Sequence, residues 1–269
     1  MPKFSICTPC WYDAEHPHNA RQPRFELFLR CVNSVLSQTC EDFEWVIADD
    51  ICTPPVSEVI KDKDERIKTF RLEEKLGRIA ARNKAMLEAK GEWITVLDAD
   101  DEYSSLYLQA LDDASRLYPD YDMFSMNHLI FHYDYSTEIR KFIDVEKLEG
   151  RPFGSGTIGA GAYAFKKSLY EKVGPLPEKG LWDLAEWAFE TYPEIKPFFW
   201  NENKQGYNSL GNPWGDDYIY FYMLTRLGKC KHLNTALYNV HSHYGERFHE
   251  DPDYNLGEEK APQWNPQIR

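Results

Sequence analysis

The sequence predicts an α/β fold in which a mostly parallel central sheet is flanked by helices. Strand-like apolar runs alternate with segments of helical periodicity over roughly the first 100 residues. Three of the expected strands end in polar or acidic residues, as strands do where parallel sheets bind ligands. The chain has 269 residues, 42% of them hydrophobic, which is enough to bury a sizeable core.

The first half of the chain supplies the parallel part of the sheet. Strands are expected at residues 4–8, 43–48, 67–72 and 93–97. Between them, apolar residues recur every three or four positions, which indicates helices. These helices are expected at residues 25–38, 56–61 and 77–89. Gly91 is expected to end the third helix, because glycine readily adopts the left-handed conformation that closes helices.

The second half continues the sheet with weaker signals. We expect helices at residues 104–117 and 218–227, strands at 122–131 and 231–240, and a polar excursion or hairpin at 133–151. A glycine-rich stretch at 154–161 precedes Tyr163. An aromatic-rich stretch occupies residues 182–214. Residues 1–244 are expected to form one domain with a smaller subregion in its second half, followed by a loosely held acidic tail at 245–269.

Composition limits the partners and location of the protein. A net charge of −13 disfavours a general attraction to nucleic acid or anionic lipid. The N-terminus lacks the pattern of a signal peptide, and no apolar run reaches the ~20 residues of a membrane helix. We therefore expect a cytoplasmic protein, free or peripheral to the inner face of a membrane. Cys7 and Cys10 have C-x-x-C spacing, but Pro9 between them favours a strand over a redox or zinc site.

Three expected strands end in residues that can contact a ligand. They are Thr8-Pro9, Asp49-Asp50 and Asp98-Ala99-Asp100-Asp101. Because the carboxyl ends of parallel strands meet at one edge, these residues should line a common crevice. The carboxylates at 98–101 suit Mg²⁺ or Mn²⁺, which bind hard oxygen ligands and substrate phosphates. A calcium loop is excluded, because Tyr103 and Gln109 stand where an EF-hand needs Gly and Glu. A solvated acidic turn is the structural alternative.

Five segments together resemble the family 2 glycosyltransferases. They are residues 4–9, 34–39, 43–50, 77–85 and 89–101, in the order and spacing of that family. The resemblance covers residues 3–110 well and the remainder weakly. It implies a GT-A fold, a nucleotide-diphosphate sugar donor, inversion at the transferred sugar and a divalent metal. The chain departs from the family pattern at 51–53, where many relatives have a glycine- or serine-rich turn.

The resemblance also implies which residues bind the donor, within a nucleotide-sugar-binding half at residues 1–110. Thr8 and Pro9 would line the nucleoside pocket, and Asp50 would face the base or ribose. Arg82 would contact the donor, and Asp98 would bind the ribose and the metal–diphosphate group. A turn carboxylate that caps the next element is the alternative for Asp50. A surface position on a helix is the alternative for Arg82.

The metal ligands and the general base follow from the same resemblance. Asp100 and Asp98 would hold Mn²⁺ or Mg²⁺, and His241 would be a third ligand, since neutral imidazole can bind metals. An inverting transfer needs a carboxylate to take the acceptor proton. Asp217 is the first choice for that base and Asp216 the second. Helix capping by both aspartates, and a surface position for His241, are the structural alternatives.

Residues 111–244 are expected to bind the acceptor. Trp182 and Trp214 could stack on sugar rings, and Gly161 could let the backbone approach a ligand closely. Packing of the chain's own core is the alternative for the aromatic residues. The acceptor could be a glycan, a lipid-linked sugar, a protein or a modified base, the last disfavoured by the negative charge.

The sequence thus predicts a metal-dependent inverting glycosyltransferase of glycan or surface polysaccharide biosynthesis, with a UDP-linked donor. A degenerate, non-catalytic sugar-nucleotide-binding module is the main alternative. A sugar nucleotidyltransferase is disfavoured, because the glycine-rich, arginine-containing loop of that class is missing after the first strand.

Overall fold

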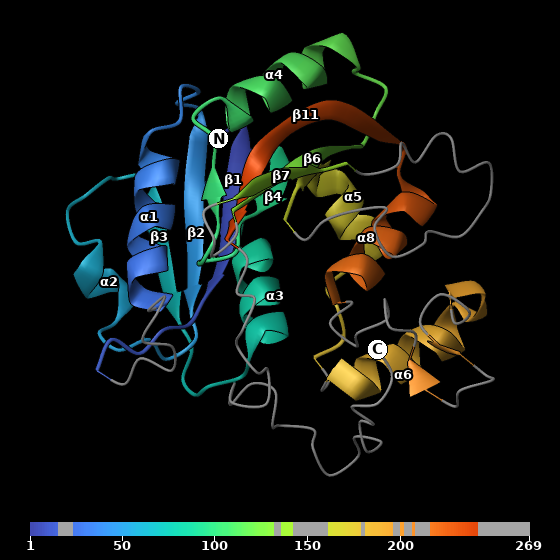
Figure 1. The fold of residues 1–269 in the computed structure, drawn as a ribbon, viewed down its shortest axis with the longest axis horizontal. Coiled ribbons are helices and arrows are strands. Elements are labelled where there is room, and N and C mark those ends of the chain that lie inside the picture. The colour runs from blue at the N-terminus through green and yellow to red at the C-terminus, as the bar shows by residue number, and fades with distance from the viewer. Residues whose placement is uncertain are drawn as a thin grey trace.

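A mixed β-sheet with helices on both faces organises the computed structural model (Figure 1). The structure describes residues 1–15, 24–131, 136–141, 161–178, 181–195, 200–201, 206–207 and 216–241. Within these residues the main sheet has the strand order β3-β2-β1-β4-β8-β6-β11-β5, with β7 paired to β6. Its strands are β1 (Phe4–Cys10), β2 (Phe43–Asp49), β3 (Ile67–Arg71), β4 (Trp93–Val96), β5 (Glu102–Tyr103), β6 (Met123–Phe131), β7 (Thr137–Arg140), β8 (Tyr163–Lys166) and β11 (Cys230–His241).

The two halves of the sheet differ in strand direction. The strands β1 to β4 pair in parallel, as predicted. In the second half, β8 is antiparallel to both β4 and β6, whereas β11 is parallel to β6 and antiparallel to β5. The hairpin expected near residues 133–151 is present as the antiparallel pair of β6 and β7. A separate small pair joins β9 (Trp200–Asn201) and β10 (Gly206–Tyr207).

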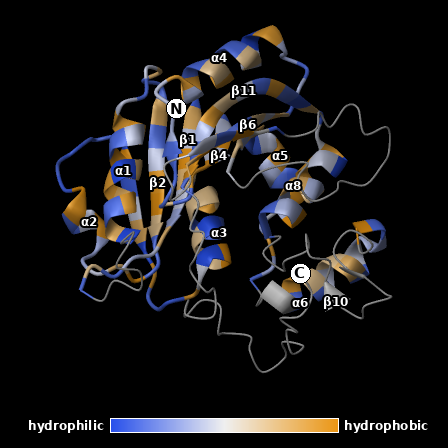
Figure 2. Ribbon diagram, in the orientation of Figure 1, coloured by the Kyte–Doolittle hydropathy of each residue, from blue (hydrophilic) through white to orange (hydrophobic). Residues whose placement is uncertain are grey.

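Helices cover the sheet on both sides and divide the core into two clusters. On one face lie α1 (Arg24–Leu36), α2 (Val56–Val59) and α4 (Tyr107–Leu117). On the other face lie α3 (Arg78–Glu88), α5 (Lys167–Val173), α6 (Leu181–Thr191) and α8 (Asp216–Leu227). Figure 2 shows hydrophobic and hydrophilic residues interleaved along α1 and α4, as the helical spacing of the sequence predicts.

The central strands are buried along their whole length because helices cover both faces. All seven residues of β1 and of β2 are buried, whereas β3 at the edge alternates between partly buried and exposed. Cys7 packs into the cluster under α3, and Cys10 into the cluster under α1. The two thiols of the C-x-x-C spacing therefore face opposite sides of the sheet and cannot hold one ion between them.

Several local features differ from the sequence prediction. The helix α3 ends at an extended Ala89, so Gly91 does not close it by a left-handed cap. Instead, a Cβ on Gly91 would lie 2.7 Å from the Phe4 carbonyl carbon and the Ser5 backbone nitrogen, so glycine is needed for close approach to β1. The helices α5 and α6 and the strands β5 and β8 were not predicted. The acidic tail at 245–269 lies outside the described residues.

Candidate active site

The acidic segment after β4 forms a tight turn at the carboxyl edge of the sheet. The backbone N–H of Asp101 donates to the Asp98 carbonyl oxygen at 3.1 Å and closes the turn. Asp98 and Asp100 are partly exposed, whereas Asp101 is buried. The turn therefore presents two carboxylates toward solvent and keeps the third inside, which divides the predicted D-x-D-D cluster into two roles.

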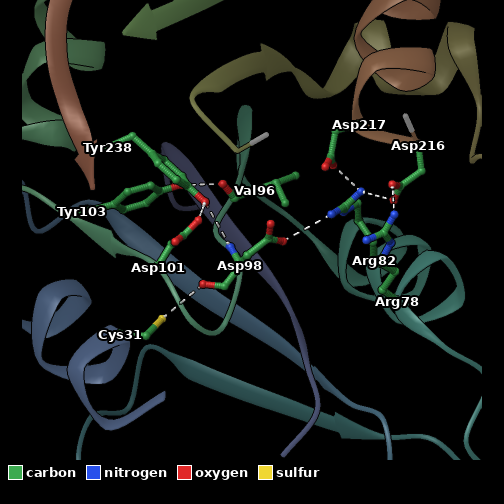
Figure 3. Close-up of polar contacts among 10 residues, drawn as sticks. All are labelled: Cys31, Arg78, Arg82, Val96, Asp98, Asp101, Tyr103, Asp216, Asp217 and Tyr238. Atoms are coloured by element: carbon green, nitrogen blue, oxygen red, sulfur yellow. Dashed lines mark hydrogen bonds and ion pairs between the residues drawn. The ribbon is translucent and has the colours of Figure 1, made fainter. Parts of the chain in front are cut away.

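Asp101 fastens this turn to the end of β11. Its carboxylate accepts a hydrogen bond from the Tyr238 hydroxyl at 2.9 Å and another from the His241 backbone N–H at 3.1 Å. The Tyr238 hydroxyl also accepts from the Asp98 backbone N–H at 3.4 Å (Figure 3). Burial, followed by repulsion from Asp100 and Asp98, raises the pKa of Asp101. Asp101 is thus a structural carboxylate that orients its neighbours.

Arg82 joins the acidic turn to the start of α8. Its guanidinium is 3.2 Å from Asp98 Oδ1 and 2.7 Å from Asp216 Oδ2, and it also forms an ion pair with Asp217 (Figure 3). The side chain is only 2% exposed, so the alternative of a surface position is wrong. Residues from the two halves of the chain, predicted separately as donor-side and base-side, therefore meet on one guanidinium.

Arg78 was missed by the sequence prediction. It lies one helical turn before Arg82 on α3, and its guanidinium is 2.5 Å from Asp216 Oδ1. The i, i+4 spacing of two arginines on one helix was the available signal, because such residues share a helix face.

Asp216 and Asp217 have different environments although they are adjacent. The Asp216 side chain is fully buried, and each of its oxygens contacts an arginine. The Asp217 side chain is 19% exposed and forms an ion pair with Arg82 (Figure 3). Burial raises the pKa of Asp217 to about 7, with Arg82 opposing the shift and Asp216 adding to it. Asp217 is therefore the accessible carboxylate with a pKa suited to proton transfer near neutral pH.

The site carries a surplus of negative charge that a divalent cation would offset. Three carboxylates, from Asp98, Asp216 and Asp217, contact the guanidinium groups of Arg78 and Arg82, and Asp100 and Asp101 add two more on the same turn as Asp98. Burial raises the pKa of Asp98, with Arg82 opposing the shift and Asp100 adding to it. Mg²⁺ commonly uses one or two carboxylates together with substrate phosphates. The partly exposed oxygens of Asp98 and Asp100 fit that pattern.

The predicted third ligand, His241, is engaged elsewhere. Its Nε2 lies 2.5 Å from Glu102 Oε1, a partner that the sequence did not reveal. Within the described ranges, no three His, Cys, Asp or Glu side chains are grouped so that they could hold a metal ion. For His241 to bind a metal through Nε2, the imidazole would first have to leave Glu102.

Asp50 holds the loop before α3. Its two carboxylate oxygens accept hydrogen bonds from the backbone N–H groups of Leu76 at 2.8 Å and Gly77 at 2.9 Å. Asp49 similarly accepts from the N–H groups that follow β2, at Cys52 and Val56. The capping alternative for Asp50 is therefore present in the structure. It places this carboxylate beside the N-terminus of α3, the helix that carries Arg78 and Arg82.

The two residues predicted to line the nucleoside pocket lie within β1, because this strand extends to Cys10 and does not end at Thr8. Thr8 and Pro9 belong to β1 itself and are buried, and the Thr8 hydroxyl accepts from the Trp45 indole N–H at 2.9 Å. The first residue beyond the strand is Trp11. Lys75 Nζ lies 3.5 Å from one ring centroid of Trp11, and the Arg24 guanidinium lies 5.0 Å from it. Trp11 was missed, although its position after a strand that ends at the crevice was a usable signal.

The acceptor-side predictions are only partly described by the structure. Gly161 has φ +75°, and a Cβ there would lie 2.2 Å from the Tyr238 hydroxyl oxygen. Gly161 therefore makes room for Tyr238, the residue that anchors Asp101. Trp182 belongs to α6, but its side chain lies outside the described residues, as does all of Trp214.

Comparisons with known proteins show which family the chain resembles. Residues 18–122 match the model of glycosyl transferase family 2. Over these residues, which are less than half of the chain, the sequence is similar to that family. TuaG of Bacillus subtilis, assigned as a teichuronic acid biosynthesis glycosyltransferase, is 39% identical to the domain over 105 residues, 38% of this chain and 37% of TuaG. WcaA of Escherichia coli, assigned to colanic acid biosynthesis, is 33% identical over 106 residues, 38% of this chain and 34% of WcaA. The chain thus aligns with about a third of these relatives' length.

Solved structures show that the domain has the predicted GT-A fold. Residues 1–349 of S. aureus TarS in complex with UDP match with a TM-score of 0.60 and 14% identity, covering 89% of this chain and 60% of that one. The same TarS fragment in complex with UDP-GlcNAc matches with a TM-score of 0.58 and 16% identity, covering 93% and 61%. None of the helices in the described part of the domain is long and apolar enough to cross a bilayer.

Proposed function

We propose that the chain transfers a sugar from a UDP-linked donor to an acceptor hydroxyl, with inversion and with Mn²⁺ or Mg²⁺ as cofactor. The observation that carries the proposal is the buried Arg82, which contacts Asp98 on the acidic turn and Asp217 at the start of α8. UDP and UDP-GlcNAc in the TarS complexes support the donor class. The assignments of TuaG and WcaA support an acceptor in surface polysaccharide biosynthesis.

In the proposed reaction Asp217 takes the proton of the acceptor hydroxyl. The acceptor oxygen then forms a bond to the anomeric carbon from one side, while the bond from that carbon to the diphosphate breaks on the other and its electron pair leaves with UDP. Asp98 and Asp100 would hold the cation, with His241 as a third ligand once it is released from Glu102. The bound cation would neutralise the departing diphosphate.

UDP release from a panel of UDP-sugars in the presence of Mn²⁺ tests this function. We expect the wild-type chain to release UDP from at least one donor. Asp217→Asn should lower kcat by about 100-fold or more, since general base catalysis contributes at least that much, and should leave UDP binding intact. Asp113→Asn, at an exposed carboxylate of α4, is the matched control and should retain full activity. If the wild type binds UDP but turns over no donor, the result would favour a non-catalytic sugar-nucleotide-binding module over a transferase.

A further inference from the structure

Two buried polar atoms beside Arg82 have no hydrogen-bond partner among the residues that the structure describes: Tyr163 Oη and Asp217 Oδ1. The Nε of Arg82 is a third such atom in the same place. Asp217 Oδ1 contacts the Arg82 guanidinium as an ion pair, but the contact lacks the alignment of a hydrogen bond. Most buried polar groups in proteins are paired, so unpaired atoms gathered at one point need an explanation.

Tyr163 is held rigidly in this position. It is the first residue of β8 and is 1% exposed, and its ring packs edge-on against Phe221 of α8 with 5.4 Å between centroids. Burial raises the pKa of Tyr163, and Asp217 is the charged group that raises it most. The hydroxyl therefore stays protonated at neutral pH and can donate a hydrogen bond next to the carboxylate of Asp217.

The fold supplies hydrogen-bond partners for the hydroxyl groups of other buried tyrosines. The Tyr103 hydroxyl donates to the Val96 carbonyl at 2.9 Å, and the Tyr107 hydroxyl lies 2.9 Å from Thr95 Oγ1. Tyr12, also buried without a partner for its hydroxyl, packs with Phe28 on the opposite face of the sheet. Tyr163 is thus set apart by its place beside the proposed base.

A hydroxyl group is the chemical class that fits these atoms. It can accept a hydrogen bond from Tyr163 Oη and at the same time donate its own hydrogen to Asp217 Oδ1. We propose that Tyr163 is a further catalytic residue, which holds the acceptor hydroxyl against Asp217. During transfer the acceptor proton passes to Asp217, the oxygen bonds to the anomeric carbon, UDP leaves with the electron pair, and Tyr163 keeps its proton. The proposal rests on the proposed function, because it uses Asp217 as the base.

Tyr163→Phe separates this role from a structural one. Because the hydroxyl has no hydrogen-bond partner in the described part of the chain, its removal should leave Tm unchanged or raise it. Release of UDP from UDP-GlcNAc and Mn²⁺, with water as the acceptor hydroxyl, should slow by about 10-fold or more in kcat. The Kd of UDP-GlcNAc measured by calorimetry should be unchanged. Tyr107→Phe is the matched control, which should lower Tm through its lost hydrogen bond to Thr95 and keep kcat.

Three results would overturn the proposal. A fall in Tm that accounts for the lost activity would make the hydroxyl structural. An unchanged kcat would show that the hydroxyl is not used. Weaker binding of UDP-GlcNAc than in the wild type, with kcat unchanged, would show that the Tyr163 hydroxyl contacts the donor sugar and not the acceptor.

A second measurement distinguishes failure of this proposal from failure of the proposed function. If the wild type releases no UDP, the transferase function fails by itself. The hydroxyl site is then tested by thermal shift with UDP, Mn²⁺ and a high concentration of N-acetylglucosamine as the hydroxyl probe. The sugar should stabilise the wild type and Tyr107→Phe but not Tyr163→Phe, and equal stabilisation of all three, or of none, would reject the site.

Discussion

Arg82 is the side chain on which the geometry of the crevice depends. The Arg82 side chain is 2% exposed, so its guanidinium has lost its hydration. Its contacts with Asp98, Asp216 and Asp217 replace that hydration, and loss of any one of them would leave a buried charge without full compensation. Arginine suits this role better than lysine, because its planar fork reaches several carboxylates at fixed angles. The proposed base is therefore positioned by the same residue that touches the donor side.

The pH dependence of turnover follows from Asp217. Burial raises the pKa of its carboxyl to about 7, so the carboxyl is protonated below that pH and ionised above it. Only the ionised form can take a proton, so kcat/KM for UDP release should rise by about tenfold per pH unit below pH 7 and level off above it. Rates measured from pH 5 to 9 in a constant-ionic-strength buffer would show this limb. A flat profile across pH 7 would argue against Asp217 as the base.

At the scale of the elements, the acidic turn depends on the close approach of Gly161, just before β8, to Tyr238 of β11. Tyr238 on β11 anchors Asp101, and it occupies the space that Gly161 leaves open just before β8. The backbone of Gly161 also has φ +75°, a left-handed conformation that costs other residues roughly 1–2 kcal/mol. Two separate effects therefore require glycine at this position.

Gly161→Ala tests this packing against a matched control. We expect it to lower the free energy of unfolding by about 2–4 kcal/mol. This figure is the sum of the cost of backbone strain and the cost of overpacking against Tyr238. Gly174→Ala, at φ +79° with nothing within 4 Å of the new Cβ, should show the backbone strain alone. Urea denaturation of both variants gives the comparison. Equal losses would mean that Tyr238 moves aside without cost.

Local signals explain which elements the sequence predicted. The apolar strands β1, β2 and β4 and the periodic helices α1 and α3 are encoded within short windows, and the structure confirms them with small shifts at their ends. The strand β5 escaped prediction because two residues carry no periodicity, and only pairing with the distant β11 makes Glu102–Tyr103 a strand. Ile51 lies in the segment 51–53, where the sequence departs from the family pattern, and its φ of 65° is a conformation that glycine adopts more easily than isoleucine.

At the scale of the whole molecule, strand order brings the site together. The acidic turn follows β4, and the antiparallel β8 lies between β4 and β6, so the second half of the chain returns beside the first. The sequence could predict that strand ends converge in the parallel half. It could not predict that Arg82 would meet Asp216 and Asp217, since that contact spans 134 residues or more and depends on how α8 packs.

The charge of the whole molecule leads us to expect that nucleotide binding depends on a cation. The chain carries a net charge of −13, and carboxylates gather at the candidate site, so an anionic diphosphate should be repelled unless a metal intervenes. We expect UDP to raise Tm in the presence of Mn²⁺ and not in the presence of chelator. At about 100 times Kd the gain in free energy of unfolding should be about 2.7 kcal/mol. Asp100→Asn should abolish it, and Asp113→Asn should not, as measured by thermal shift and titration calorimetry. Equal UDP binding with and without chelator would instead assign the neutralisation of the diphosphate to Arg78, Arg82 and Lys75, the cations already present around the crevice.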